Sequence, residues 1–348
     1  MKRIRDLFWP AVGLVAVVWS VRLLYVKMQA EVSADPAVKA RLDSLGVWGD
    51  IQVIASVIAE KLAGITPLSY LLAFASTLLA YGALAWYDRI ALLHLNRQKG
   101  VSFLYVSVCS FVTYALSHNI GASVFSGGMV RFRAYTAKGL TAPEVAVLVG
   151  LCSFTFAFGV IILLGIVLVL EPGILAPLGE LSGAFAMGDH LARGLGLALL
   201  AFCALYTIGS WRHFPPLKIG GFELVYPRLP IVARQYIAAP MELIGAAGII
   251  YFALPHENVP FMLVLGAFLL SFSAGLLSQV PGGVGVMEAV FLAVMPQVPA
   301  TSVFAALLVW RLFYLILPLV ASIPVVLLFE RSQLGKATRN VEPPPAIH

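Results

Sequence analysis

A carboxylate and an arginine lie inside apolar stretches of the second half of the sequence. Glu288 follows the run Pro281-Gly282-Gly283-Val284-Gly285, and Arg311 lies within the last long apolar segment. If these stretches cross a membrane, each charge costs several kcal/mol unless it is paired or hydrated. The sequence leaves two roles open: a buried ion pair that locks two elements together, or a substrate site to which Glu288 and Arg311 contribute.

Polar residues also interrupt an earlier apolar segment that begins at Val101. The interruption contains Ser117, His118, Asn119, Gly121 and Ser123, and it is followed by Gly127, Gly128, Arg131 and Arg133. A half-helix beginning after Gly121 points free backbone amides and a positive dipole end inward, which favours an anion such as a lipid phosphate. The alternative is that the polar groups cap a broken helix and the arginines only mark topology.

The breaks themselves need a structural explanation. Three glycines and a proline within five residues cannot continue a helix, because Pro281 lacks an amide donor and glycine favours other conformations. Non-helical backbone at membrane depth survives only where it is buried in protein or lines a cavity. We therefore expect two half-helices, 261–279 and 285–295, that meet deep in the membrane.

Composition assigns the class of protein. Of 348 residues, 60% are hydrophobic and only 11% are charged, against about 25% charged in soluble globular domains. The sequence predicts an all-α polytopic membrane protein. Its net charge of +6 comes from Lys and Arg clustered in short loops, which is a topology signal and does not indicate a nucleic-acid partner. The single cysteines Cys109, Cys152 and Cys203 lack metal-site spacing, and no cofactor is predicted.

Six full spans are predicted. An amphipathic helix on the membrane surface is expected within 26–66. The second span ends in Trp86-Tyr87-Asp88-Arg89, whose aromatic residues suit the membrane interface, and a basic loop is expected over 211–239. A capping box at Thr141 and Glu144 opens the third span. The spans cover 8–25, 67–86, 141–170, 194–209, 240–254 and 301–329.

The loop charges predict how the chain crosses the membrane. If both interrupted segments are re-entrant hairpins, sixteen Lys and Arg lie on the cytoplasmic side and five outside, whereas single crossings divide them almost equally. This predicts one membrane domain over 1–330, with inverted halves 8–170 and 194–329. Both termini and the polar tail 331–348 are then cytoplasmic. Inverted repeats with Gly- or Pro-interrupted segments point to a transporter's central site.

The residues around these breaks resemble a known family. Tyr87-Asp88, Ser117-His118-Asn119-Ile120-Gly121, Arg131, Pro281-Gly282-Gly283-Val284-Gly285 with Glu288, and Arg311 are similar to the lysylphosphatidylglycerol synthetase transmembrane-region family. This family includes the flippase-like membrane half of the multiple peptide resistance factors.

The resemblance implies a bacterial inner-membrane protein that flips aminoacylated phosphatidylglycerol or a related phospholipid. Full-length members also carry a soluble aminoacyl-tRNA-dependent transferase domain, and this chain stops at His348. We therefore expect a stand-alone translocase that does not itself make lysyl-lipid. The sequence contains no P-loop, HExxH or GxSxG motif of soluble enzymes.

A second interpretation stays open. The chain could be a membrane-embedded enzyme, or an accessory subunit of a separately encoded soluble lipid aminoacyl-transferase. A homo-oligomer is compatible with either interpretation. The sequence does not set the lipid, the direction of flipping or any ion coupling.

Overall fold

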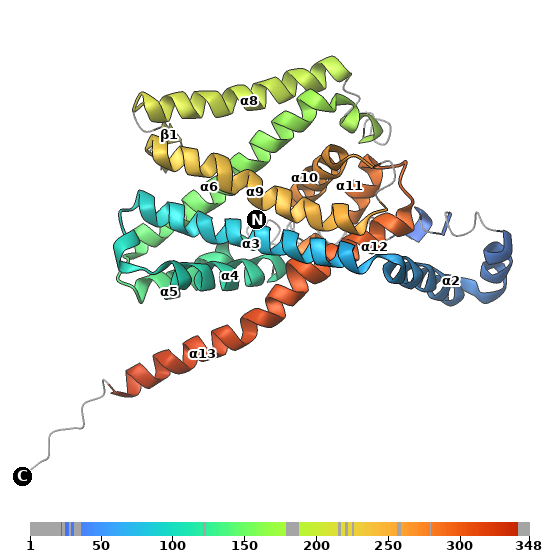
Figure 1. Cartoon of the computed structure of the whole chain (residues 1–348), viewed down its shortest axis with the longest axis horizontal. Helices are drawn as coiled ribbons and strands as arrows, with labels where there is room; N and C mark the ends of the chain where they lie inside the picture. The colour runs from blue at the N-terminus through green and yellow to red at the C-terminus, as the bar shows by residue number, and fades with distance from the viewer. Residues whose placement is uncertain are drawn as a thin grey trace, which may run out of the picture.

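The computed structural model describes residues 22, 25–27, 29–30, 36–120, 123–178, 188–214, 217–219, 222–224, 226–255, 259–278 and 280–339. It is an all-α polytopic membrane protein with one short β-hairpin (Figure 1). The longer helices are α2 (Pro36–Gly64), α3 (Pro67–His94), α6 (Ala142–Leu170), α8 (Asp189–Trp211), α9 (Leu229–Ala253) and α13 (Leu317–Arg339). The shorter ones are α4 (Phe103–Ile120), α5 (Ser123–Thr136), α10 (Phe261–Leu277), α11 (Val286–Val294) and α12 (Ala300–Trp310), with η1 (Gln98–Gly100), η2 (Pro172–Leu175), η3 (Pro281–Gly283) and η4 (Arg311–Ile316).

Five helical segments in the described part of the chain are long and apolar enough to cross a membrane. They are α3, α6, α8, α9 and the continuous segment Ala300–Phe329, which joins α12, η4 and most of α13. These correspond to five of the six predicted spans. The first predicted span, 8–25, lies almost entirely outside the described residues.

Helices α3 and α9 pack tightly at the centre of the molecule (Figure 1). A Cβ atom at Gly245 would lie 2.9 Å from both the Ala80 amide nitrogen and the Ser76 carbonyl oxygen. Only a residue without a side chain permits this approach, and small residues at helix contacts are typical of membrane bundles. The pair forms a rigid frame around which the interrupted segments lie.

The first interrupted segment forms a helical hairpin of α4 and α5, which we call hairpin one. The Tyr105 hydroxyl at the beginning of α4 donates to the Ala134 carbonyl near the end of α5 at 2.7 Å. Closer to the tip, a Cβ at Gly127 would lie 3.1 Å from the Thr113 methyl group. The two helices are therefore antiparallel. Helices α10 and α11 pack together in the same way around η3 and form hairpin two.

Hairpin one begins and ends at the same end of the molecule. Arg97, after α3, forms a 2.7 Å salt bridge with Glu144 in the first turn of α6, and Arg228, before α9, donates to Asn96 Oδ1 at 2.9 Å. The loops after α3, between α5 and α6, and before α9 thus share what we call the basic end. Entry of the hairpins into the bilayer from one side, and the cytoplasmic location of this end, stay predictions.

The capping box predicted at the start of α6 is confirmed. The Thr141 backbone amide donates to Glu144 Oε2 at 2.8 Å, and the Thr141 hydroxyl donates to the same oxygen at 2.9 Å. This satisfies one of the amides that a helix N-terminus leaves without a partner.

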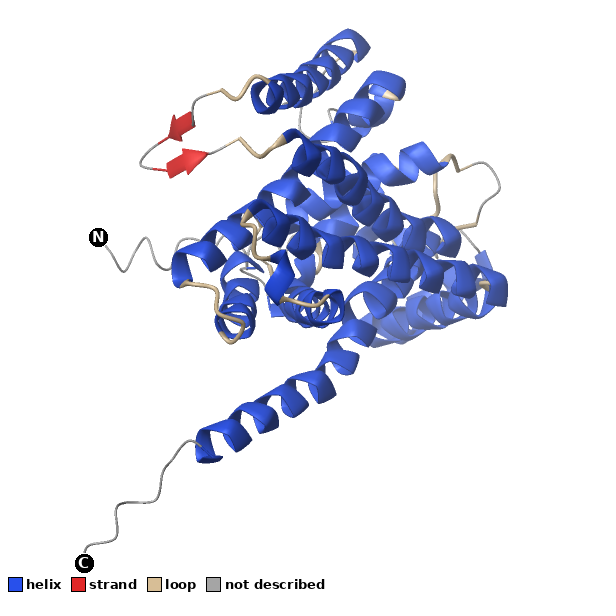
Figure 2. Cartoon of the chain, turned by 60° about the vertical axis from the view of Figure 1, so that its left-hand side comes forward, coloured by secondary structure: helices blue, strands red, loops and turns tan. Residues whose placement is uncertain are grey.

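Two predicted boundaries were wrong. Helix α3 continues to His94, so Tyr87 and Asp88 do not lie at an interface but are fully buried. Neighbouring helices, and not lipid headgroups, surround their polar groups. The predicted loop 211–239 is also too long, because α9 already begins at Leu229, and Pro230 in its first turn starts the helix instead of preventing it. The rest of the loop contains the antiparallel strands β1 (Leu217–Ile219) and β2 (Phe222–Leu224), shown in Figure 2.

Candidate functional site

A π-helix occupies the middle of the last membrane-length segment. In η4 the backbone hydrogen bonds shift register, so carbonyl groups become available to side chains. The Tyr81 hydroxyl donates to the Tyr314 carbonyl at 3.0 Å, and the Asn119 amide donates to the Leu315 carbonyl at 3.1 Å. A π-helical turn is frequently a functional feature. Here it is the place where both hairpins meet the last span.

The tip of hairpin one lies on η4. The His118 ring stacks on the Tyr314 ring, with centroids 5.2 Å apart and planes at 18°. Ser117 is buried beside Gly127, where a Cβ would lie 3.4 Å from the serine Cβ. Predicted residues Ser117, His118 and Asn119 are therefore brought together. Gly121 and the side chain of Ser123 lie outside the described residues.

The turn of hairpin two reaches the same π-helix. Gly282, Gly283 and Gly285 have φ angles of 61°, 62° and 83°, a region that side chains rarely tolerate. Arg311, the first residue of η4, donates from Nη1 to the Gly282 carbonyl at 2.8 Å. The end of α4 also packs against η3. Both broken segments thus converge on one mid-span point.

Glu288 and Arg311 form a salt bridge of 2.5 Å between Oε1 and Nη2. The second carboxylate oxygen of Glu288 accepts from the Gly285 amide at 2.7 Å. Both oxygens are therefore engaged by hairpin two and η4, which is the geometry expected of the locking pair. The pair holds the turn of hairpin two against the π-helix.

A second buried salt bridge lies between α3 and α5. Arg131 Nη2 contacts Asp88 Oδ1 at 2.7 Å, and its Nε lies 3.2 Å from both carboxylate oxygens. The Tyr135 hydroxyl donates to Asp88 Oδ2 at 2.8 Å, and the Cys152 thiol donates to Oδ1 at 3.4 Å. Arg131 also lies 4.8 Å above the Tyr114 ring. Arg131 is therefore buried inside the protein, where Asp88 holds its charge between α3 and α5.

Glu242 and Tyr314 complete the central cluster. The Tyr314 hydroxyl donates to Glu242 Oε1 at 2.5 Å, and Trp310 stacks on Tyr314 with centroids 5.1 Å apart. The composition and motifs of the sequence did not identify Tyr314 or Tyr135. A signal existed, since Tyr314 follows Arg311 by three residues and Tyr135 follows Arg131 by four, spacings that share a helix face.

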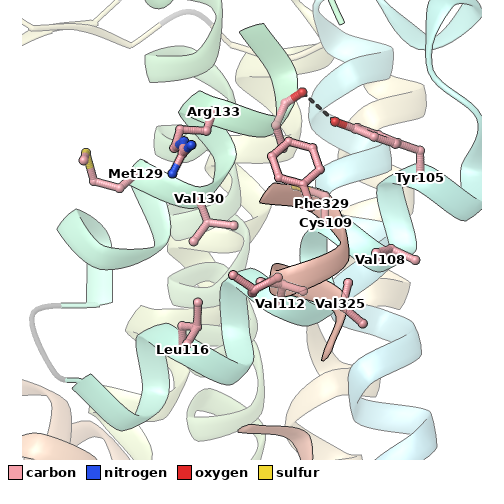
Figure 3. Close-up of a pocket in the computed structure, with 12 residues that line it drawn as sticks. Tyr105, Val108, Cys109, Val112, Leu116, Met129, Val130, Arg133, Val325 and Phe329 are labelled. Atoms are coloured by element: carbon pink, nitrogen blue, oxygen red, sulfur yellow. Dashed lines mark hydrogen bonds between the residues drawn. The ribbon is translucent and has the colours of Figure 1, made fainter. Parts of the chain in front are cut away.

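An apolar crevice of about 320 Å³ lies between hairpin one and α13 (Figure 3). Arg133 is the charged residue among the described residues of its wall. Figure 3 shows the Arg133 guanidinium beside Val130 and Met129 on the α5 wall. We call this space the hairpin-one crevice. Its wall contains Tyr105, Val108, Cys109, Val112, Leu116, Met129, Val130, Arg133, Ala134, Val325, Val326 and Phe329.

A larger cavity of about 680 Å³ lies at the end opposite the basic end. It is bounded by the C-terminal end of α2, the N-terminal ends of α3 and α12, and the C-terminal end of α9, and Glu60 and Lys61 lie in its wall. Along the last span, η4 lies between the residues that line this cavity and those of α13 that line the hairpin-one crevice. No group of three His, Cys, Asp or Glu side chains suited to a metal ion occurs within the described residues.

Broken helices, membrane-length spans and buried ion pairs define a multi-pass membrane protein with a polar centre. The chain is 30% identical over 287 residues to "Uncharacterized protein slr0712" from Synechocystis sp., and the match covers 81% of this chain and 84% of the relative. It belongs to the family of that protein. It is also 28% identical over 307 residues to the inner membrane protein YbhN of Escherichia coli, covering 86% of this chain and 89% of YbhN.

A shorter match links the chain to a lipid-modifying protein. Over 108 residues it is 28% identical to the phosphatidylglycerol lysyltransferase of Staphylococcus haemolyticus, which is 30% of this chain and 12% of that protein. No family model matches the chain. The chain is thus related to the inner membrane protein YbhN. The short match agrees in part with the expected lysylphosphatidylglycerol synthetase transmembrane-region family.

Proposed function

We propose that this protein is a lipid translocase that moves aminoacylated phosphatidylglycerol or a related phospholipid between the leaflets of the bacterial inner membrane. The observation that carries the proposal is the convergence of both hairpins on the π-helix η4. There Asn119 of hairpin one donates to the Leu315 carbonyl, and Arg311 of η4 donates to the Gly282 carbonyl of hairpin two. Two interrupted segments that meet at mid-span are the arrangement in which transporters build a central site. The match to a phosphatidylglycerol lysyltransferase supports a lipid as the cargo.

The hairpin-one crevice suits a phospholipid by its chemistry. Its wall is apolar along α4 and α13, which favours acyl chains, and Arg133 supplies a cation for a phosphate. Arg133 lies one turn from the end of α5, at the basic end. In this proposal the lipid enters from the side of the bundle, with its headgroup toward the basic end and its chains along α13.

The buried pairs then have a positioning role. Glu288 and Arg311 keep hairpin two on η4, and Asp88 holds Arg131 between α3 and α5. Each pair holds one hairpin against a membrane-length helix. Movement of a hairpin relative to that helix would open a path on one side of the convergence and close it on the other.

A leaflet-resolved assay tests the proposal. Purified protein is reconstituted into liposomes that contain fluorescent phosphatidylglycerol or lysyl-phosphatidylglycerol, and the lipid accessible to an impermeant quencher is followed with time. We expect faster exchange between leaflets than in protein-free liposomes, with no change in lipid identity by mass spectrometry. Exchange at the protein-free rate would contradict the proposal. A change in lipid mass would favour the membrane-embedded enzyme.

Two matched pairs of variants test whether the lipid binds in the hairpin-one crevice. Val108→Trp fills the wall of the crevice, whereas Leu104→Trp adds the same ring one turn earlier on α4, at a residue that is 74% exposed. Arg133→Gln removes the crevice cation, whereas Arg234→Gln removes an exposed charge near the basic end. We expect the first member of each pair to slow exchange several-fold and the second to leave it unchanged. Equal rates within both pairs would remove the crevice from the path.

A further inference from the structure

Glu242 lies in the middle of α9 and its side chain is completely buried. The Tyr314 hydroxyl donates to Oε1, and Oε2 is buried with no hydrogen-bond partner among the described residues. A buried acceptor without a partner is unusual in a folded protein and needs an explanation. The neighbouring charges provide one.

Buried carboxylates elsewhere in the described chain have a counter-charge. Asp88 is paired with Arg131 and Glu288 with Arg311, but no salt bridge joins Glu242 to any described residue. An isolated carboxylate in an apolar environment is strongly disfavoured relative to its neutral acid. The same burial is tolerated when a proton occupies one oxygen, because the group is then uncharged.

Among the described residues, the titratable groups around Glu242 come from two elements. Tyr314 belongs to η4, and Tyr81 and Tyr87 come from α3, where Tyr87 donates to the Ala239 carbonyl at 3.4 Å. His118 of α4 lies on the other side of the cluster and stacks on the Tyr314 ring. Tyrosine is neutral at ordinary pH, so it provides hydrogen bonds without charge. The described residues of α10 and α12 contribute no titratable side chain, and the Asp88–Arg131 pair is already neutralised internally.

Glu242 is connected to the part of the molecule that holds both hairpins. Tyr314, which donates to Glu242, also accepts a hydrogen bond from the Tyr81 hydroxyl at its backbone carbonyl. Its ring stacks on His118 at the tip of hairpin one. A movement of that tip or of η4 would therefore displace the hydroxyl that binds the carboxyl group. Displacement would admit water to a group that is otherwise dry.

We propose that Glu242 binds a proton when buried, through Oε2, and releases it to water when η4 moves, so that lipid translocation is coupled to proton movement. On binding, one proton from water adds to Oε2 while Oε1 continues to accept from Tyr314. On release, that proton passes to water and leaves the carboxylate hydrated. The binding of the proton is independent of the cargo, whereas the coupling rests on the proposed lipid translocation.

Infrared difference spectroscopy on the purified protein tests the proton directly. At neutral pH the wild-type protein should show the C=O stretch of a protonated carboxyl group that is absent from Glu242→Gln. Glutamine keeps an oxygen acceptor for Tyr314, so this variant should fold. The band should persist in Glu144→Gln, which changes a carboxylate that is 22% exposed and paired with Arg97 at the beginning of α6. Tyr314→Phe should retain the band but shift it toward higher frequency, because one hydrogen bond is lost.

Lipid exchange under a pH gradient tests the coupling. The wild-type rate should change when the pH gradient across the liposome is reversed, whereas the rate of Glu242→Gln should not. A neutral-pH spectrum without a Glu242 band would overturn proton binding. If the band is present and wild-type exchange ignores the gradient, the coupling is overturned and proton binding stands. If no lipid exchange occurs at all, only the proposed function fails, because the infrared result does not depend on it.

Discussion

The Asn119 side chain donates to the Leu315 carbonyl at 3.1 Å and so joins the tip of hairpin one to the π-helix of the last span. The same amide donates at 2.8 Å to the Ala115 carbonyl in its own helix. The two N–H groups of the Asn119 side chain therefore bind one carbonyl in α4 and one carbonyl in η4. Since the Leu315 carbonyl lies in protein and not in water, it has few alternatives.

Asn119→Ala should loosen hairpin one from η4. Loss of the donor leaves a buried carbonyl without a partner, which costs about 1–3 kcal/mol. We expect a lower thermal unfolding midpoint in detergent and slower lipid exchange. Ser107→Ala is the matched control on α4, because its hydroxyl donates to the Phe103 carbonyl within the same helix. Similar midpoints for the two variants would show that the Asn119 contact does not hold the tip.

Much of hairpin two could be predicted from the sequence. A proline and three glycines interrupt an apolar run visibly, and Glu288 and Arg311 are conspicuous among apolar residues. The structure joins the two charges in a salt bridge, which is the geometry of the locking pair that the sequence left open. Such features depend on local composition, which a single sequence displays.

The centre of the site could not be predicted in the same way. The π-helix depends on a change of hydrogen-bond register that Tyr81 and Asn119 stabilise from other elements. The partner of Arg131 lies 43 residues away on α3, and no spacing rule connects the two. Asp88 was misplaced because an aromatic pair beside charges is also typical of a membrane interface.

Substitution at Gly282 should disturb the turn of hairpin two. Its φ of 61° disfavours any side chain, and a Cβ would lie 3.4 Å from Arg311 Nη1, so Gly282→Ala should cost about 1–2 kcal/mol. Gly128→Ala is the control, because Gly128 lies within α5 with open space around it. There alanine should stabilise the helix by about 0.5–1 kcal/mol. Opposite shifts of the unfolding midpoint are expected, and a stabilised Gly282→Ala would show that the turn tolerates a side chain.

The buried pair of Asp88 and Arg131 should matter far more than an exposed pair. Asp88→Asn leaves the Arg131 charge buried without a counter-ion, a loss of about 3–5 kcal/mol in comparable buried pairs. Glu144→Gln removes one charge of the exposed salt bridge to Arg97, whose side chain is 47% exposed. Because glutamine keeps an oxygen acceptor for the Thr141 amide, this variant should cost at most about 1 kcal/mol. Denaturation followed by tryptophan fluorescence measures both. Equal effects would mean that water reaches Arg131.

Glu288 and Arg311 can be tested by removing their charges together. Glu288→Gln alone leaves Arg311 partly buried and unpaired, and should lower stability by up to about 3–5 kcal/mol. Adding Arg311→Gln removes the stranded charge, and the two amides can still bind the Gly285 amide and the Gly282 carbonyl. Stability and lipid exchange should therefore recover together in the double variant. A stable but inactive double variant would instead assign Glu288 to the lipid headgroup.

The basic end predicts the orientation of the molecule in the membrane. The loops that meet there carry Arg97, Lys138 and Arg228, and positively charged loops remain on the cytoplasmic side. A cysteine at Lys138, which is exposed at this end, should resist an impermeant thiol reagent applied to intact spheroplasts. A cysteine at Gly173, which is exposed beyond the other end of α6 and has open space for a side chain, should react.

Both cysteines are introduced into a background in which the buried Cys109, Cys152 and Cys203 are replaced by alanine. Permeabilised cells provide the control, since both positions should then be labelled. If hairpin one crossed the membrane, the loop before α6 would lie outside and the labelling at 138 and 173 would be reversed. Reversal would contradict the cytoplasmic placement of the basic end and, with it, the direction from which a lipid enters the hairpin-one crevice.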